Sequence, residues 1–125
     1  MAQRVYLTVA EVLAIHHRQI ETYGGSHGLR DVGALEAAVF RPQTGYYNNL
    51  AEEAAALMES LANNHPFLDG NKRVAFDASH TFLLMNGFTI EADPEEPTSS
   101  WSTLKAGSGH TLGFLLSNFS YFPSL

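Results

Sequence analysis

The sequence predicts one compact all-α domain, a helical bundle of about six helices. Apolar residues recur at helical spacing in several segments, and short turns rich in Gly, Pro and Asn separate these segments. Hydrophobic residues make up 45% of the 125-residue chain and charged residues 16%, which is typical of a globule with a single core. Since internal repeats and linkers are absent from the sequence, we assign residues 1–125 to one domain.

The first predicted helix begins in a capping box, Thr8-Val9-Ala10-Glu11, where the Thr8 hydroxyl and the Glu11 carboxylate can each accept a free backbone amide. It ends at Gly24-Gly25, as glycines commonly end helices. Its apolar face is predicted to consist of Val9, Leu13, His16 and Ile20, with Val12 and Tyr23 beside them. We interpret His16 as a core histidine with a hydrogen-bond partner.

Asp31 is the predicted N-cap of a second helix, which ends at Arg41-Pro42 because the residue before a proline disfavours the helical conformation. Residues 42–49 are polar and aromatic and lack a helical period. They form either an open loop or a short β-hairpin about Thr44-Gly45.

Two strongly apolar segments follow. Residues 51–64 are rich in Ala, Glu and Leu and carry one apolar face, so they form the clearest predicted helix. Residues 71–86 are apolar almost all round, which predicts a helix at the centre of the bundle. After Gly87, residues 88–90 are expected to be extended. Trp101 and Leu104 suggest one short helix in the tail, and residues 112–119 another.

The overall composition excludes several classes of protein. Seven basic and thirteen acidic residues give a net charge of −6, the wrong sign for a protein that binds nucleic acid through phosphate contacts. The chain has no cysteine, which excludes disulfides and thiolate chemistry and fits a cytoplasmic location. The N-terminus does not resemble a signal peptide, and no apolar run reaches the roughly 18 residues of a membrane span.

Residues 63–73, between the two apolar helices, are the stretch that packing does not explain. From position 65 they read His-Pro-Phe-Leu-Asp-Gly-Asn-Lys-Arg. A helix that starts at Gly70 or Asn71 has free amides at the positive end of its dipole, and glycine lets a ligand approach the backbone closely. Lys72 and Arg73 add two positive charges at the same place. This combination predicts a cradle for an anion, and phosphate suits it best.

Asp69 precedes this cradle and would repel a bare phosphate. It is suited to holding a hard cation such as Mg²⁺ that bridges the phosphates of a nucleotide. His65 is the nearby group that can exchange a proton near neutral pH, which makes it the candidate general base. A hydroxyl deprotonated by His65 could attack a phosphate of the bound nucleotide. A purely structural turn would not need all of these residue types together.

The stretch from His65 to Arg73 resembles the signature of the Fic/Doc superfamily, in particular its Doc (death-on-curing) toxin branch. The resemblance runs over about residues 5–90. It includes Ile15-His16, Tyr23-Gly24-Gly25, Gly28-Leu29-Arg30-Asp31, Arg41-Pro42-Gln43 and Asn86-Gly87. It implies an all-α Fic fold and transfer from a Mg²⁺-bound nucleoside triphosphate, ATP, to a protein hydroxyl.

The resemblance also implies a role for each matching residue. His65 would be the base and Asp69 the Mg²⁺ ligand. The phosphate binders would be Gly70, Asn71, Lys72 and Arg73, with Asp77 a weaker candidate one turn further on. Residues 43–49 lie where the family has a flap that docks the target's backbone.

Two departures from the AMP-transferring Fic pattern concern the phosphate cradle. Lys72 stands where that pattern has glycine, and Phe76 stands where it has a second arginine. The loss of one phosphate clamp can change which phosphate faces the hydroxyl. In the Doc branch the implied reaction is transfer of the γ-phosphate to elongation factor Tu, which arrests translation. An AMP-transferase and a non-catalytic binding module with the same fold remain alternatives.

The resemblance also implies that another protein regulates the site. Self-inhibited Fic proteins carry a Ser/Thr-x-x-x-Glu-Gly/Asn motif, and no glutamate in this chain is followed by Gly or Asn. Inhibition would then come from a Phd-like antitoxin. His17 and His27 are expected to be exposed and His80 to serve in packing or on a helix surface. No His/Glu or Cys/His spacing resembles a zinc site.

Overall fold

The computed structural model describes residues 4–91, 103–106 and 111–112, and within them it contains four α-helices and one short 3₁₀ helix. The helices are α1 (Val9–Tyr23), α2 (Val32–Phe40), η1 (Arg41–Gln43), α3 (Leu50–Asn63) and α4 (Asn71–Met85). Three short strands follow, β1 (Phe88–Glu91), β2 (Thr103–Ala106) and β3 (Thr111–Leu112). The predicted helical fold is confirmed for the described residues.

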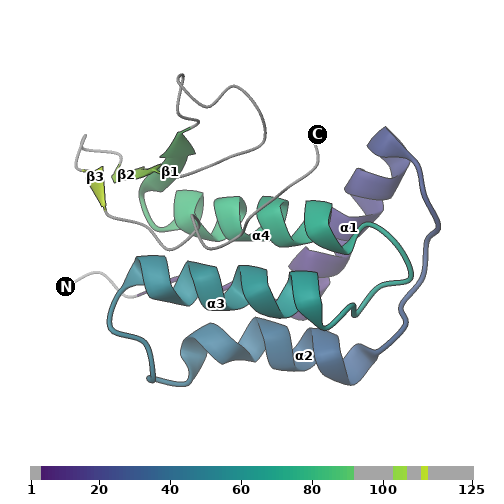
Figure 1. Cartoon of the computed structure of the whole chain (residues 1–125), viewed down its shortest axis with the longest axis horizontal. Coiled ribbons are helices and arrows are strands. Elements are labelled where there is room, and N and C mark those ends of the chain that lie inside the picture. Colours follow the sequence, from purple (N-terminus) through teal and green to yellow (C-terminus); the bar gives the residue numbers. More distant parts are fainter. Residues whose placement is uncertain (1–3, 92–102, 107–110, 113–125) are drawn as a thin grey trace.

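Helix α4 is at the centre of the packing. It lies along α3, which in turn packs on α2, and α1 contacts the same central helix (Figure 1). The contact between α3 and α4 buries apolar side chains from both helices. The core consists mainly of Leu57, Met58, Leu61, Phe67, Val74, Phe82 and Leu83, with Val12 and Leu35 from the first two helices.

Helices α1 and α2 begin where their predicted capping residues lie. Both bonds of the capping box are present at the start of α1, where the Glu11 amide donates to Thr8 Oγ1 and the Thr8 amide to Glu11 Oε1. The Asp31 carboxylate accepts the Ala34 amide at the start of α2, and Asn49 caps α3 in the same way. Each bond satisfies an amide that the helix itself leaves free.

The buried face of α1 differs from the predicted one. It consists of Val12, Ile15, His16, Gln19 and Ile20. Leu13 and Tyr23 are exposed instead. Helix α1 packs against α4 through polar as well as apolar contacts. Gln19 is buried because it donates to Asp77 of α4, and Arg18 forms an ion pair with the same carboxylate.

Residues 42–49 do not form the β-hairpin that was one of the two predictions. The 3₁₀ helix η1 comes first, and residues 44–49 form an irregular segment with bends and no strand. The Arg41 side chain explains this conformation, because it donates to the Tyr47 hydroxyl (2.6 Å) and to Glu59 and Ser60 of α3. The segment is therefore held against α3 as a loop.

The residues after α4 form a small antiparallel sheet in the order β1-β2-β3. Leu104 lies in β2, paired with Ile90 of β1, and Leu112 lies in β3. The short helices expected at these two leucines are thus wrong in the described part of the tail. Trp101 and residues 113–119 lie outside the described residues.

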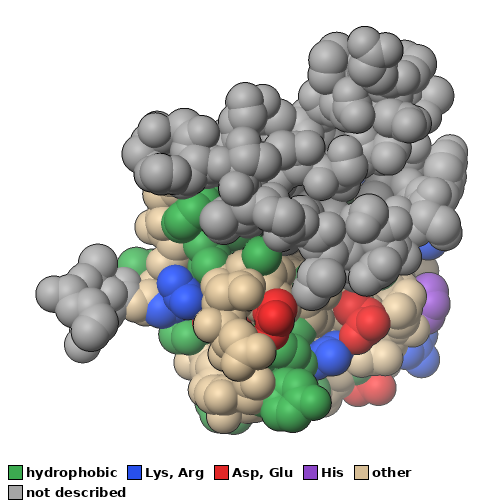
Figure 2. Space-filling view, turned by 60° about the vertical axis from the view of Figure 1, so that its left-hand side comes forward, with side chains coloured by type: hydrophobic (Ala, Val, Ile, Leu, Met, Phe, Trp, Pro, Cys, Tyr) green, Lys and Arg blue, Asp and Glu red, His purple; other side chains and the backbone are tan. Residues whose placement is uncertain are grey.

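The described surface carries charges of both signs. On the face shown in Figure 2, acidic and basic side chains alternate with apolar and uncharged ones, and no large patch of one sign forms among the coloured residues. Two ion pairs join segments that are distant in the chain, Arg4 with Glu53 and Arg18 with Asp77. None of the described helices is long and apolar enough to cross a membrane.

Candidate active site

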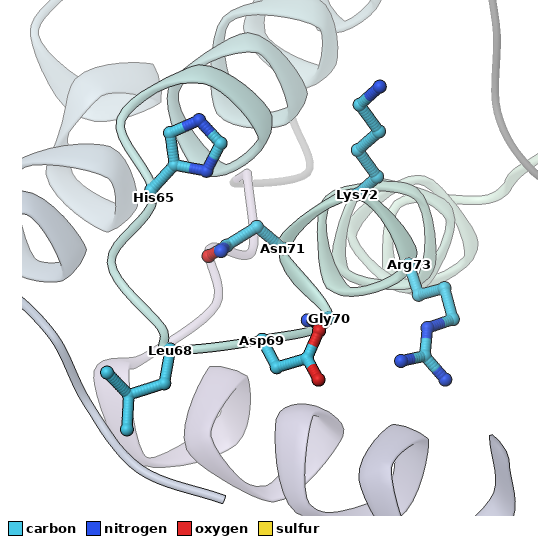
Figure 3. A pocket seen from close by; sticks show the side chains of 7 residues that line it. All are labelled: His65, Leu68, Asp69, Gly70, Asn71, Lys72 and Arg73. Atoms are coloured by element: carbon cyan, nitrogen blue, oxygen red, sulfur yellow. Dashed lines mark hydrogen bonds between the residues drawn. The ribbon is translucent and has the colours of Figure 1, made fainter. Parts of the chain in front are cut away.

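An open pocket of about 370 Å³ lies where the loop after α3 enters α4. Its lining consists entirely of the motif identified in the sequence, namely His65, Leu68, Asp69, Gly70, Asn71, Lys72 and Arg73 (Figure 3). Its volume is in the range of small-molecule sites. The structure thus brings together every predicted site residue except Asp77.

The start of α4 provides free backbone donors to this pocket. Gly70 is the N-cap residue in the left-handed conformation (φ 79°), which glycine adopts without strain. No side chain caps the helix, and the amides of Asn71, Lys72 and Arg73 have no acceptor among the described residues. Three free amides at the positive end of a 15-residue helix form a typical anion site.

The Asn71 side chain is hydrogen-bonded within the motif loop. Its side-chain oxygen accepts the Phe67 amide (3.0 Å), and its side-chain nitrogen donates to the Phe67 carbonyl (2.9 Å). The carboxamide therefore closes the motif loop on itself, which leaves the Asn71 backbone amide as its free donor toward the pocket. The Asn71 side chain thus positions the motif loop, and phosphate binding by Asn71 stays a prediction that its backbone amide can serve.

Buried aromatic packing beneath the loop fixes its position. The Phe67 ring is 1% exposed and stacks on the His16 imidazole at a centroid distance of 3.9 Å. His16 Nε2 donates to the Asp69 carbonyl oxygen at 2.9 Å. Because burial disfavours the charged ring, the pKa of His16 is lowered. The interpretation of His16 as a core histidine with a hydrogen-bond partner is confirmed.

The Asp69 carboxylate is exposed at the pocket and held by two backbone amides. Gly70 donates to Oδ1 at 2.9 Å, and Ser26 donates to Oδ2 at 3.1 Å. No lysine or arginine of the described chain forms an ion pair with Asp69. Its oxygens retain lone pairs toward the pocket, so the carboxylate is oriented, ionisable and free to ligate a hard cation.

His65 lines the pocket on the incoming loop, apart from Asp69 (Figure 3). Its side chain is exposed, and its backbone has a positive φ of 49°, which is uncommon outside glycine. Arg30 supports this conformation: its Nε donates to the His65 carbonyl (2.6 Å) and its Nη2 to the Asn64 carbonyl (2.7 Å). The imidazole is therefore presented to solvent from a fixed backbone.

The two basic residues of the motif differ in how firmly they are held. Arg73 Nη2 donates to the Gly24 carbonyl at 3.1 Å, and its guanidinium carbon lies 5.8 Å from the centre of the Tyr23 ring. Lys72 is exposed and extends away from Asp69 (Figure 3). Arg73 is thus a positioned cation, whereas Lys72 is exposed and extends into solvent.

Asp77 does not contribute to the pocket. Its Oδ2 accepts from Arg18 Nη2 (2.7 Å) and from Gln19 Nε2 (2.8 Å), both on α1. The ion pair with Arg18 stabilises the packing of α1 against α4, and a carboxylate would repel a phosphate. Asp77 thus lies outside the pocket lining, and its role as a phosphate-site residue stays a prediction.

The sequence did not reveal that the loop of residues 24–31 supports the motif loop through hydrogen bonds. Arg30 and Asp31 donate their amides to the Pro66 carbonyl, and the Gly28 carbonyl accepts the Leu68 amide (3.1 Å). Leu29 and Phe67 form an isolated antiparallel bridge. No periodic pattern predicts such contacts, and the sequence signal for them was the pair of glycines that turn the chain after α1.

Together, the helical fold and the pocket define a class of protein: an α-helical domain that presents a carboxylate, an imidazole and an anion-binding helix start on one loop. The chain belongs to the Fic/DOC family, whose model matches residues 6–83. This match and the names of two relatives confirm the predicted resemblance to the Doc branch.

Two curated relatives show how far the similarity extends. The "Toxin Doc" of Mycolicibacterium smegmatis is 49% identical over 76 residues, which cover 57% of this chain and 58% of that protein. The "Protein kinase doc" of Escherichia phage P1 is 33% identical over 94 residues, which cover 72% of this chain and 75% of that protein. The chain thus spans somewhat more than half of the length of the first relative.

Proposed function

We propose that this protein is the toxin of a toxin–antitoxin pair and transfers the γ-phosphate of Mg²⁺-ATP to a hydroxyl of a cytoplasmic translation protein, elongation factor Tu. The observation that carries the proposal is the pocket in which Asp69, His65 and the free amides of α4 meet. The names of the two relatives, a toxin and a protein kinase, support the same reaction.

The proposed reaction assigns one proton transfer to this chain. His65 accepts the proton of the target hydroxyl as that oxygen attacks the γ-phosphorus, and the bond to the β-γ bridging oxygen breaks to release ADP. His65 is suited to this role because it is exposed at the rim, where a second protein can reach it. The free amides of α4 and the Arg73 guanidinium hold the phosphate oxygens and stabilise their charge.

The donor set around Asp69 fits a magnesium ion. Asp69 is an exposed carboxylate without an ion-pair partner in the described chain, and Mg²⁺ in nucleotide sites is commonly held by one or two carboxylates and the phosphates. When bound, the ion would neutralise phosphate charge. The Ser26 and Gly70 amides orient the carboxylate for this role.

Phe76 favours phosphate transfer over AMP transfer by the same site. This residue stands at the position where the AMP-transferring pattern has a second arginine, and its side chain is 6% exposed and part of the core. No cationic clamp is therefore present at that position. Transfer of AMP is the second candidate function, and a binding module without catalysis is the third.

Two labelled forms of ATP distinguish these functions in one experiment. The purified protein is incubated with Mg²⁺ and a bacterial lysate, once with γ-labelled and once with α-labelled ATP. We expect label in a lysate protein of the size of elongation factor Tu only from the γ position. Label that enters only from the α position would establish AMP transfer instead.

His65→Ala tests the proposed base. We expect the variant to lose at least about 100-fold in the rate of label transfer, since general-base catalysis contributes on that order, while nucleotide affinity is retained. Full toxicity and full labelling by His65→Ala would exclude His65 as the base, whereas toxicity without label transfer by either protein would favour the binding module.

Asp69→Ala tests the cation site. We expect the Mg²⁺-dependent part of ATP binding to disappear in calorimetric titration, because Asp69 is the only carboxylate that lines the pocket. The fold should persist, since the side chain is exposed. Titrations of the variant that remain dependent on Mg²⁺ would refute the assignment.

We also propose that a Phd-like antitoxin inhibits the site from outside. The chain lacks the glutamate motif by which self-inhibited relatives block the nucleotide, and the pocket is open. Leu68, which lines the pocket, and Leu29, which pairs with Phe67 of the motif loop, are exposed and offer apolar contacts for such a partner.

A further inference from the structure

A second group of chemically reactive side chains lies outside the pocket, on the exposed side of α1. His17 and Glu21 belong to α1, and His27 belongs to the loop that follows this helix. One ligand atom from each residue lies within 4.8 Å of the other two. The sequence-based statement that no His/Glu spacing resembles a zinc site overlooked this cluster.

The backbone explains why the three side chains meet. His17 and Glu21 are four residues apart and therefore share one face of α1. Gly24 (φ 88°) and Gly25 (φ 121°) then turn the chain back along the helix, which brings His27 over that face. His27 Nε2 lies 2.7 Å from Glu21 Oε2, and the ring centroids of His17 and His27 are 5.0 Å apart.

We propose that His17, Glu21 and His27 form a zinc-binding site, with water completing the coordination. Two imidazoles and one carboxylate are a ligand set that Zn²⁺ uses, whereas Mg²⁺ prefers oxygen ligands only. Ligand atoms at the usual Zn–N and Zn–O distances lie about 3.3 Å apart in a tetrahedral site. Small rotations of exposed side chains are enough to reach that spacing from the one observed.

The site connects to the motif through the loop between α1 and α2. Ser26, next to His27, donates its amide to Asp69 Oδ2, and the carbonyl of Gly28, on the other side of His27, accepts the Leu68 amide. A metal ion that fixes His27 to α1 therefore restrains the two residues that hold the motif loop. The bound ion would make the position of Asp69 more rigid.

Titration of the protein with Zn²⁺, without an affinity tag and in the absence of nucleotide, tests the site. We expect one ion per chain by calorimetry, and a loss of affinity of at least about tenfold in each of His17→Ala, His27→Ala and Glu21→Gln, since each removes one of three ligands.

Two controls match these substitutions. His65→Ala removes an exposed imidazole from the motif loop, and Glu36→Gln removes an exposed carboxylate from α2. Both should keep the wild-type zinc affinity. A wild-type protein that binds no zinc, or a loss in His65→Ala as large as in His17→Ala, would overturn the proposal.

Amide hydrogen exchange tests the connection to Asp69. We expect Zn²⁺ to slow exchange of the Ser26 amide in the wild type and to have no effect on it in His27→Ala. Zinc binding without slower exchange at Ser26 would show that the site exists but does not restrain the loop. Neither measurement depends on phosphate transfer, so the outcome is independent of the proposed function.

Discussion

Among the described residues, Arg30 connects the α1–α2 loop to the backbone of the proposed catalytic base. Its guanidinium donates to two successive carbonyls, those of Asn64 and His65. His65 has the positive φ that costs a non-glycine residue on the order of 1 kcal/mol or more. The two hydrogen bonds to Arg30 offset this cost and fix the backbone position from which the His65 side chain extends.

Substitution of Arg30 should therefore affect catalysis more than stability. For Arg30→Ala we expect a loss of about 1 kcal/mol in the free energy of unfolding, since the side chain is exposed, and a fall in the rate of label transfer of about tenfold or more. ATP affinity should change little, because Arg30 does not line the pocket. Urea denaturation and initial rates measure the two effects.

Arg18→Ala is the matched control for Arg30. It removes another exposed arginine, which pairs with Asp77 rather than with the motif loop. Its transfer rate should equal that of the wild type. If the two variants lose activity in proportion to their loss of stability, Arg30 has no specific role in positioning His65.

At the scale of elements, the sequence predicts what depends on neighbouring residues and misses what depends on distant ones. Helix starts follow from Thr8 and Asp31, because a capping side chain acts within three residues. The pairing of β2 with β1 depends on residues far along the chain, so apolar spacing alone suggested a helix there.

The candidate site shows the same division. The motif loop could be identified because its residue types and spacing are unusual within one short stretch. The bonds that hold it could not, since Arg30 and His65 are 35 residues apart. Asn71 and Asp77 show a further limit: the sequence reveals a polar group but not whether the fold already uses it.

The contact between α1 and α4 gives a prediction about Asp77. In Asp77→Asn the ion pair with Arg18 is lost, while a hydrogen bond to that side chain remains available. We expect the free energy of unfolding to fall by about 0.5–1 kcal/mol, because the Arg18 side chain is 63% exposed and the pair is screened by solvent. ATP affinity should stay within about twofold of the wild type.

Arg73→Ala is the comparison for Asp77→Asn, as both residues lie on α4 and only Arg73 lines the pocket. This variant should bind ATP at least about tenfold more weakly, as expected for a charged hydrogen bond to phosphate. Similar losses of ATP affinity in both variants would show that Asp77 belongs to the phosphate site.

At the scale of the whole molecule, two imidazoles connect folding to pH. Burial lowers the pKa of His16, although the hydrogen bond to the Asp69 carbonyl acts in the opposite direction. Burial also lowers the pKa of His80, and the Asp77 carboxylate opposes this shift. Both rings are therefore less readily protonated in the folded chain than in the unfolded one.

The sign of the pH dependence follows from this difference. Between the lowered folded pKa and the unfolded value of about 6.5, the unfolded chain binds more protons, so acid favours unfolding. The stabilising effect of the neutral rings is complete above the unfolded pKa and is lost as the pH falls through the folded pKa. We expect the free energy of unfolding, measured with urea, to fall steadily from about pH 7.5 to about pH 5, above most carboxyl titrations.

Histidine variants show whether these two rings cause the fall. In His80→Gln the slope of stability against pH should be smaller than in the wild type, since one of the two lowered pKa values is gone. His16→Gln should reduce the slope as well, but at a larger cost in stability, because the ring is 5% exposed and stacks on Phe67. Slopes equal to that of the wild type in both variants would mean that other groups cause the acid sensitivity. A smaller slope in His16→Gln alone would place the pH dependence of the fold directly beneath Asp69, at the base of the candidate site.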